Sequence, residues 1–313
     1  MELIRFWRTA FLTAAACLPD GALAQDEDPA RPDVGVEGFV SSDSDDTEIV
    51  RLAADFDLRN YESYRRTERL GVRVERAWYS FADGDTRTRE RVFLQAADTS
   101  NGWTWQARVG TDGDTIIGSA SVNDNAPFRK EVFVERDVIA TPRGVDEGLY
   151  ATFIGAAVDL PASESTVFTA LAGVQTFTGD NVRLHLGGNA IQVIDADLGL
   201  SAQVRGRYFT NSDPREFDYY SPEWYAEILP VVQMRRFVGG WQLLGAGGLG
   251  AQRDSDSDWR RATYLNARVV SPEGARDWSF RGEITYTSTP SATARTGAGY
   301  DYFQATLGVK RRF

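Results

Sequence analysis

The sequence has 313 residues, a formal net charge of −11 at neutral pH and a hydrophobic fraction of 42%. An acidic chain with dispersed arginines is not the composition of a nucleic-acid-binding protein, so no nucleic-acid partner is expected. The hydrophobic fraction excludes a chain that is disordered throughout, and the negative mean hydropathy excludes a helical membrane protein.

Residues 1–24 have the layout of a secretory signal peptide. Arg5 and Arg8 precede a short apolar stretch, and Ala22-Leu23-Ala24 forms a small-residue cleavage site. The single cysteine, Cys17, lies inside this segment, so the mature chain is expected to have no disulfide. Acylation of Cys17 is an alternative, but the three preceding alanines lack the bulky aliphatic residue of a lipoprotein signal.

Residues 25–32, QDEDPARP, predict a short, disordered periplasmic lead-in. From residue 33 to residue 313, runs of alternating apolar and polar residues are separated by clusters of Asp, Asn, Ser, Gly or Pro, and no helical period competes with them. The clearest alternations cover residues 103–109, 198–208 and 278–287. The expected fold is all-β, a transmembrane antiparallel up-and-down β-barrel of about 16 strands in the bacterial outer membrane, with both termini on the periplasmic side.

The main alternative is a large soluble sandwich or barrel, which would also alternate. Aromatic residues near expected strand ends favour the membrane, because aromatic belts mark its two interfaces. The residues assigned to these belts are Trp78, Tyr79, Trp103, Trp224, Tyr225, Trp241, Trp259, Trp278, Tyr300 and Tyr302.

The last segment, YDYFQATLGVKRRF, alternates up to a terminal Phe313. A closing strand that ends in phenylalanine is similar to the signal that outer-membrane proteins present to the barrel insertion machinery, which is therefore an expected partner together with outer-membrane lipid. Arg311 departs from the usual apolar residue, but near an interface its charged group can reach water.

Residues 218–254 read DYYSPEWYAEILPVVQMRRFVGGWQLLGAGGLGAQRD. The YYSPxxY element, the strand that runs to a proline and the glycine-rich strand after Trp241 resemble the C-terminal barrels of outer-membrane exopolysaccharide secretion porins, the cellulose and poly-N-acetylglucosamine exporters. Residues 133–161 are compatible with the same family. The resemblance implies a sixteen-stranded pore that conducts a polysaccharide chain.

Those exporters normally carry periplasmic helical repeats before the barrel, and no repeat period of that kind occurs in this sequence. We therefore expect a separate periplasmic, synthase-linked partner. Other functions left open are a general small-solute porin and a structural or adhesive surface barrel.

Alternation places a set of polar side chains on the lumen face, where they are candidates for the transport path. A mixed-charge ladder that holds the wall together is the plainer explanation for any one of them. An acidic file at Glu131, Glu135 and Asp137 would attract a cationic glucan. The candidates are Arg108, Glu131, Glu135, Asp137, Arg205, Arg207, Arg281, Glu283, Tyr302 and Gln304.

An enzymatic barrel would need a catalytic group at its rim, and the sequence has one histidine, His185. A lipid hydrolase using His185 stays a minor alternative, because no serine follows on the same strand. No metal-ligand spacing and no phosphate-binding loop occurs, so no catalytic residue, metal or cofactor is expected.

Overall fold

The computed structural model describes residues 29–63, 66–272, 277–291, 294, 297 and 299–313. The predicted signal peptide, 1–24, and residues 25–28 of the predicted lead-in lie outside the described residues. Within the described part, no helix is long and apolar enough to cross a membrane.

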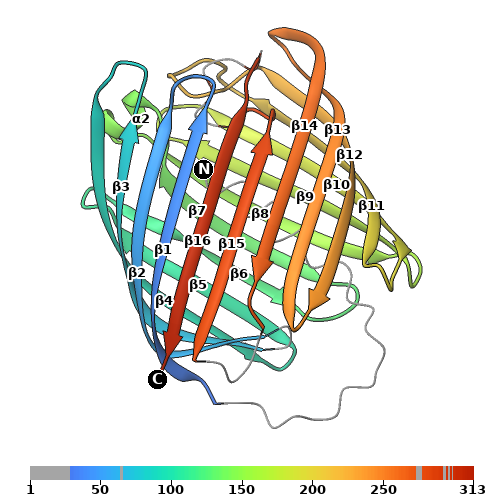
Figure 1. Cartoon of the computed structure of the whole chain (residues 1–313). Helices are drawn as coiled ribbons and strands as arrows, with labels where there is room; N and C mark the ends of the chain where they lie inside the picture. Colours follow the sequence, from blue (N-terminus) through green and yellow to red (C-terminus); the bar gives the residue numbers. More distant parts are fainter. Residues whose placement is uncertain (1–28, 64–65, 273–276, 292–293, 295–296, 298) are drawn as a thin grey trace.

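The described residues form sixteen antiparallel strands that close into one barrel (Figure 1). Each strand pairs with its neighbours in sequence, and β1 pairs with β16 to complete the wall. This confirms the expected fold class. The strands are β1 (Arg31–Asp43), β2 (Glu48–Glu62), β3 (Thr67–Ser80), β4 (Thr86–Ser100), β5 (Trp103–Thr111), β6 (Ile116–Asp124), β7 (Lys130–Val138), β8 (Tyr150–Pro161), β9 (Thr166–Phe177), β10 (Val182–Asp195), β11 (Leu200–Asn211), β12 (Trp224–Val238), β13 (Trp241–Asp254), β14 (Ser257–Val270), β15 (Trp278–Thr287) and β16 (Tyr302–Arg312).

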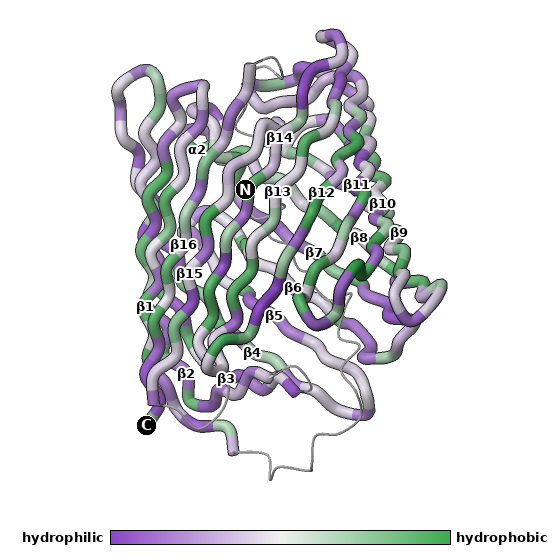
Figure 2. Tube along the Cα trace, turned by 45° about the vertical axis from the view of Figure 1, so that its right-hand side comes forward, coloured by the Kyte–Doolittle hydropathy of each residue, from purple (hydrophilic) through white to green (hydrophobic). Residues whose placement is uncertain are grey.

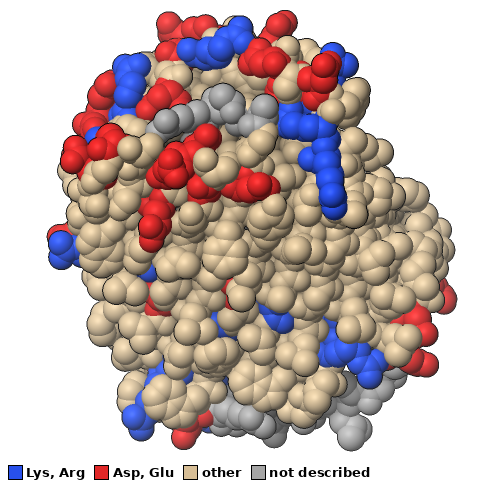
Figure 3. Space-filling view, turned by 45° about the horizontal axis from the view of Figure 1, so that its top comes forward, with Lys and Arg blue, Asp and Glu red and all other residues tan. Residues whose placement is uncertain are grey.

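Alternation along each strand separates a lipid face from a lumen face. In β11, Val204 is 46% exposed on the outside, whereas the adjacent Gln203 is 3% exposed inside. Green apolar and purple polar positions interleave along the strands in Figure 2. Charged side chains gather towards the ends of the barrel, and the side wall between them is mostly uncharged (Figure 3). A closed barrel with this outer band is an outer-membrane barrel.

The two ends of the barrel differ in the length of their connections. Arg31 and Phe313 lie at one end, here called the terminal end, where the backbone N–H of Phe313 donates to the carbonyl of Pro32 at 3.0 Å. The opposite end, here called the loop end, carries the long segments 139–149, 212–223 and 288–301. Short turns on the periplasmic side and long loops on the cell surface are typical of these barrels, so the loop end faces outward.

The aromatic assignment is correct for some residues and wrong for others. Trp103, Trp259 and Trp278 are exposed on the lipid face close to strand ends. Tyr79 and Tyr225 are at most 3% exposed and point inward, because each follows a tryptophan directly and successive side chains of a strand face opposite sides. Tyr300 and Tyr302 are also buried inside.

One short helix, α2 (Pro142–Glu147), lies between β7 and β8, where the sequence predicted no helix. Thr141 caps its N-terminus by accepting from the backbone N–H of Gly144 at 3.0 Å, and Pro142 occupies the first turn. Gly148 ends the helix in a left-handed conformation. Six residues are too few to produce a periodic signal in the sequence.

Candidate functional site

All ten predicted transport-path residues lie on the inner face of the wall. Glu131, Glu135, Tyr302 and Gln304 are buried there. Arg281 pairs at 3.1 Å with Glu62 of β2, from which β15 is separated in the wall by β16 and β1. The Arg108 guanidinium lies over the ring of the buried Phe93 of β4. The others share the inward parity of buried neighbours on their own strands: Asp137, Arg205, Arg207 and Glu283. Their role in transport stays a prediction.

The inner wall of β1 to β4 is held by ion pairs between buried groups. Arg73 lies 2.7 Å from Glu37 and 3.2 Å from Asp55. Arg69 lies 2.8 Å from Asp57, which also pairs with Lys310 of β16. Removing one member of such a buried pair leaves an uncompensated charge, so this side of the lumen is stabilised by its own contacts.

The predicted acidic file lies on β7, but its carboxylates are buried or form ion pairs with arginines of the barrel. Glu131 pairs with Arg129 at 2.9 Å, and Asp137 pairs with Arg91 at 3.1 Å. Glu135 is 4% exposed. The file therefore offers little free negative charge to a passing polymer, which weakens the case for a cationic glucan.

An arc of aromatic and basic side chains follows the inner faces of β7 to β12. The ring of Phe153 lies 5.0 Å from that of His185, and His185 lies 5.5 Å from Phe209. Phe209 stacks on Tyr225 at 5.0 Å. The Arg183 guanidinium lies 4.4 Å from the ring centre of Phe209, so cations and rings alternate along this wall.

His185 lies inside the barrel and is packed between two rings. Its Nε2 is 3.0 Å from the Gln175 side-chain oxygen. Among the described residues, neither a serine nor a carboxylate is hydrogen-bonded to it. This arrangement lacks the nucleophile and the orienting acid that a hydrolase would need.

The loop end is covered by three segments that fold back into the lumen. Ala140 and Val145 pack against inner-face residues of β1 to β4, including Phe39 and Phe93. Tyr219 stacks on Phe177 of β9 at 4.5 Å. The other contacts come from Ile139, Leu149, Tyr220, Ala294 and Tyr300. We call the described residues of these inward segments the cover: 139–149, 212–223, 288–291, 294, 297 and 299–301.

Two segments of the cover are joined at Asp218. Its carboxylate accepts from the Thr141 hydroxyl at 2.7 Å and from the backbone N–H of Arg143 at 2.9 Å. The Arg143 guanidinium lies 4.8 Å from the ring centre of Phe217. The Asp218 carboxylate thus binds the N-terminal turn of α2 and links the two segments.

A cavity of about 600 Å³ opens within the cover. Its walls include Phe217, Tyr219, Tyr220, Asp254 and Arg215. Burial raises the pKa of Tyr219 to about 12 and also raises the pKa of Tyr220, whose hydroxyl donates to Asp254. Aromatic faces beside carboxylates and hydroxyls form a surface suited to a sugar ring.

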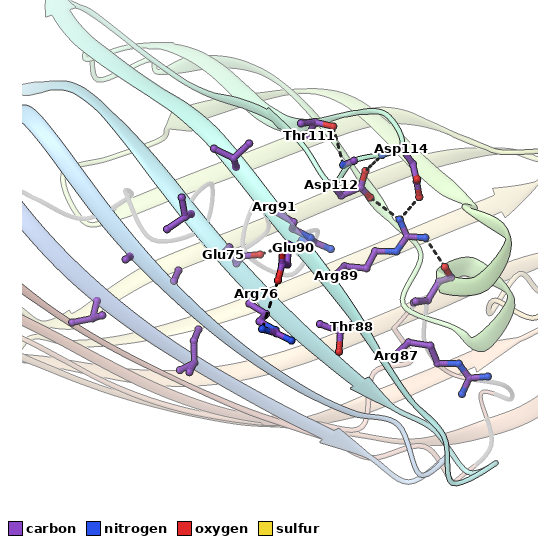
Figure 4. Close-up of a pocket in the computed structure, with 18 of the residues that line it drawn as sticks. Glu75, Arg76, Arg87, Thr88, Arg89, Glu90, Arg91, Thr111, Asp112 and Asp114 are labelled. Carbon is purple, nitrogen blue, oxygen red and sulfur yellow. Dashed lines mark hydrogen bonds and ion pairs between the residues drawn. The ribbon is translucent and has the colours of Figure 1, made fainter.

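A second cavity, of about 1290 Å³, lies beside the upper half of β4 (Figure 4). Pairing between β4 and β5 begins only at Val92, so Thr86–Arg91 extend above the end of β5. Arg89 reaches from this part of β4 to Asp112 and Asp114 of the β5–β6 turn, at 3.2 and 2.5 Å. These contacts, with that of Arg89 to the Val145 carbonyl, close the wall where strand pairing is absent.

Sequence reasoning missed the cover and the grouping of Arg183, His185 and Arg207. Strand parity could have placed the three side chains on the inner face, but which of them meet depends on the register of β10 with β11. No group of three or more residues able to hold a metal ion occurs in the described ranges.

The fold is similar to that of known outer-membrane barrels. A structure described as a bacterial polysaccharide outer membrane secretin has a TM-score of 0.66 and 11% identity, covering 92% of this chain and 100% of the other. OccK7 (OpdD) of Pseudomonas aeruginosa has a TM-score of 0.45 and 9% identity, over 91% and 98%. OprD of the same species has 0.45 and 10%, over 91% and 95%.

No protein-family model matches the sequence, and no curated protein matches it either. The solved structures thus show the fold of an outer-membrane barrel.

Proposed function

We propose that the chain is a passive exit conduit for an exopolysaccharide. The proposal rests on two features together: a closed barrel with a polar lumen, and an aromatic cavity in the cover at its cell-surface end. The similarity of the fold to that of a polysaccharide secretin also supports the proposed conduit. The barrel would do no covalent chemistry, and energy would come from synthesis behind it.

The cover gives the conduit a closed resting arrangement. Tyr219 and Tyr220 bury their rings in the lumen, and Asp218 links their segment to α2. A polymer arriving from the terminal end would have to displace these segments. A separate periplasmic partner that delivers the chain is part of the proposal.

A size-resolved release assay tests this function. Purified barrel is reconstituted into liposomes loaded with labelled oligosaccharides of two to ten sugar units and of neutral, anionic and cationic type. A conduit releases chains of six units or more when Asp218→Ala loosens the cover, and the wild type releases them more slowly. Release restricted to disaccharides in both proteins would instead support a small-solute porin.

A further inference from the structure

The inner faces of β9, β10 and β11 bring five polar side chains into one patch, here called the arginine patch: Gln175, Arg183, His185, Asn189 and Arg207. Gln175 is the register partner of Arg183, and Arg207 is the partner of Gly187. Register partners on one face of a sheet lie about 5 Å apart, and the patch extends along β10 from Arg183 to Asn189. Gly173, the register partner of His185, has no side chain, and the ring of Phe153 fills the space above it.

The two arginines of the patch have neutral partners. Arg183 is 6% exposed; its Nε donates to the Asn211 side-chain oxygen at 2.8 Å and its Nη2 donates to the Tyr220 carbonyl. The Arg207 guanidinium lies 4.7 Å from the ring centre of Tyr225. No carboxylate of the described residues forms an ion pair with either arginine.

One carboxylate, Glu227, lies next to Arg207 in register. Glu227 is the cross-strand partner of Arg207, but its Oε2 accepts from the Tyr225 hydroxyl at 2.8 Å and from the Thr289 hydroxyl. Glu227 therefore offsets part of the charge of Arg207, and Arg183 has no carboxylate partner among the described residues. Two cations beside one carboxylate leave the patch with net positive charge, and such a site favours an anion.

Hydrogen-bonding capacity is also unused in the patch. The buried atoms without a partner are Nε and Nη2 of Arg207, Nδ1 of His185, Nε2 of Gln175 and both side-chain polar atoms of Asn189. Asn189 is 3% exposed and Gln175 is 1% exposed. Each buried polar atom left unpaired destabilises a protein by about 1 to 3 kcal/mol, so several in one place indicate that something else satisfies them.

The shape of the unused atoms indicates the chemistry of the ligand. Nε and Nη2 form one edge of the Arg207 guanidinium, and a carboxylate accepts two parallel hydrogen bonds from such an edge. The Asn189 amide can donate to and accept from sugar hydroxyls. A neutral glucan would satisfy the amide but would supply no negative charge to the two arginines.

We propose that the arginine patch binds carboxylate-bearing sugar units, and that the polymer passing through this barrel is an anionic polysaccharide. The proposal rests on the proposed conduit function and names its substrate class. It replaces the cationic glucan that the acidic file of β7 suggested. Each sugar carboxylate would be held by Arg207 and then released to the next position of the chain.

Titration calorimetry of the folded barrel in detergent tests the proposal. The probes are hexasaccharides of galacturonate, of glucose and of glucosamine. We expect the uronate to bind at least tenfold more tightly than the neutral sugar, and Arg207→Gln to remove this preference. Arg207→Lys keeps the positive charge but lacks the two parallel N–H donors of the guanidinium edge, and it should give an intermediate affinity. Arg261→Gln, the same change on the lipid face, should leave binding unchanged.

The outcomes separate this proposal from the conduit function. Any of four results would overturn the anionic assignment. These are equal binding of the galacturonate and glucose probes, tighter binding of the glucosamine probe, equal losses of affinity in Arg207→Gln and Arg261→Gln, and no binding of any probe. The liposome release assay decides the conduit function independently, because it registers passage of chains of any charge. Heat-dependent mobility in gel electrophoresis verifies that every variant is folded.

Discussion

Replacing Asp218 by alanine should open the barrel by releasing one segment of the cover from another. The carboxylate accepts from the hydroxyl of Thr141, which is buried, at 2.7 Å. A buried hydrogen bond to a charged group contributes about 1.5 to 3 kcal/mol. Its loss should shift the ratio of closed to open cover by about tenfold to 150-fold, since 1.4 kcal/mol is a factor of ten. The lost bond from the backbone N–H of Arg143 acts in the same direction.

Single-channel recording in a planar bilayer measures this ratio as open probability. Asp218→Asn should give a smaller increase than Asp218→Ala, because one acceptor oxygen remains. Asp258→Ala removes an exposed carboxylate of β14 near the same end and serves as the matched control. An open probability in Asp218→Ala equal to that of Asp258→Ala would refute the role of Asp218 in closure.

Three further predictions concern stability and assembly. Tyr225→Phe removes a buried hydroxyl whose oxygen lies 2.8 Å from two acceptors, Glu227 Oε2 and Gln252 Oε1, which share its one proton. The change should lower the free energy of unfolding by about 1 to 2 kcal/mol in urea titration, and an unchanged midpoint would contradict this. Phe313→Ala should reduce the heat-modifiable, membrane-inserted fraction several-fold, whereas wild-type insertion levels would exclude Phe313 as the insertion signal. Burial opposes ionisation of Asp112, but hydrogen bonds from Tyr150 and from the backbone of Asp114 hold its pKa below 3.8. The ionised carboxylate therefore stabilises the β5–β6 turn fully above pH 3.8, and this stabilisation is lost as the pH falls through the lower pKa of the folded state. Hydrogen exchange in segment 139–149 should become faster at that low pH, and an unchanged exchange rate would contradict the role of Asp112.

Alternation in the sequence predicted most of the barrel, because the side-chain period of a strand is a local property. It placed Arg205 and Arg207 inside and Val204 outside, and the even strand number followed from the same pattern. The beginning of the first strand was expected two residues late, since β1 begins at Arg31 rather than at residue 33.

The aromatic residues were assigned wrongly where residue type was used in place of the alternation along the strand. Tyr79 and Tyr225 were assigned to the membrane interface because they are aromatic and close to strand ends. Alternation alone would have directed them inward, opposite Trp78 and Trp224. Polar groups inside the barrel give a tyrosine hydroxyl its partners, as Arg91 does for Tyr79 at 2.6 Å.

The cover could not be predicted from local sequence. Ile139, Val145 and Leu149 are scattered apolar residues between two strands, and their burial depends on β1 to β4 and β9, which are distant in the chain. The contact between Thr141 and Asp218 joins residues 77 positions apart. Such pairs form only after the barrel has closed and has fixed both segments above the same opening.

The arginines on the two sides of the lumen differ in their ion pairs, and this difference affects where a polymer can bind. On β1 to β4, Arg73 lies within ion-pair distance of three carboxylates, so drawing its guanidinium toward a passing sugar would leave those carboxylates buried and unpaired. On β11, Arg207 forms no ion pair among the described residues, and its unused edge can bind and release a ligand without breaking an existing hydrogen bond. Transport needs binding that is favourable enough to admit the chain and weak enough to let it leave. The path that we propose for the polymer therefore follows β9 to β12, and the opposite wall would serve as the rigid support.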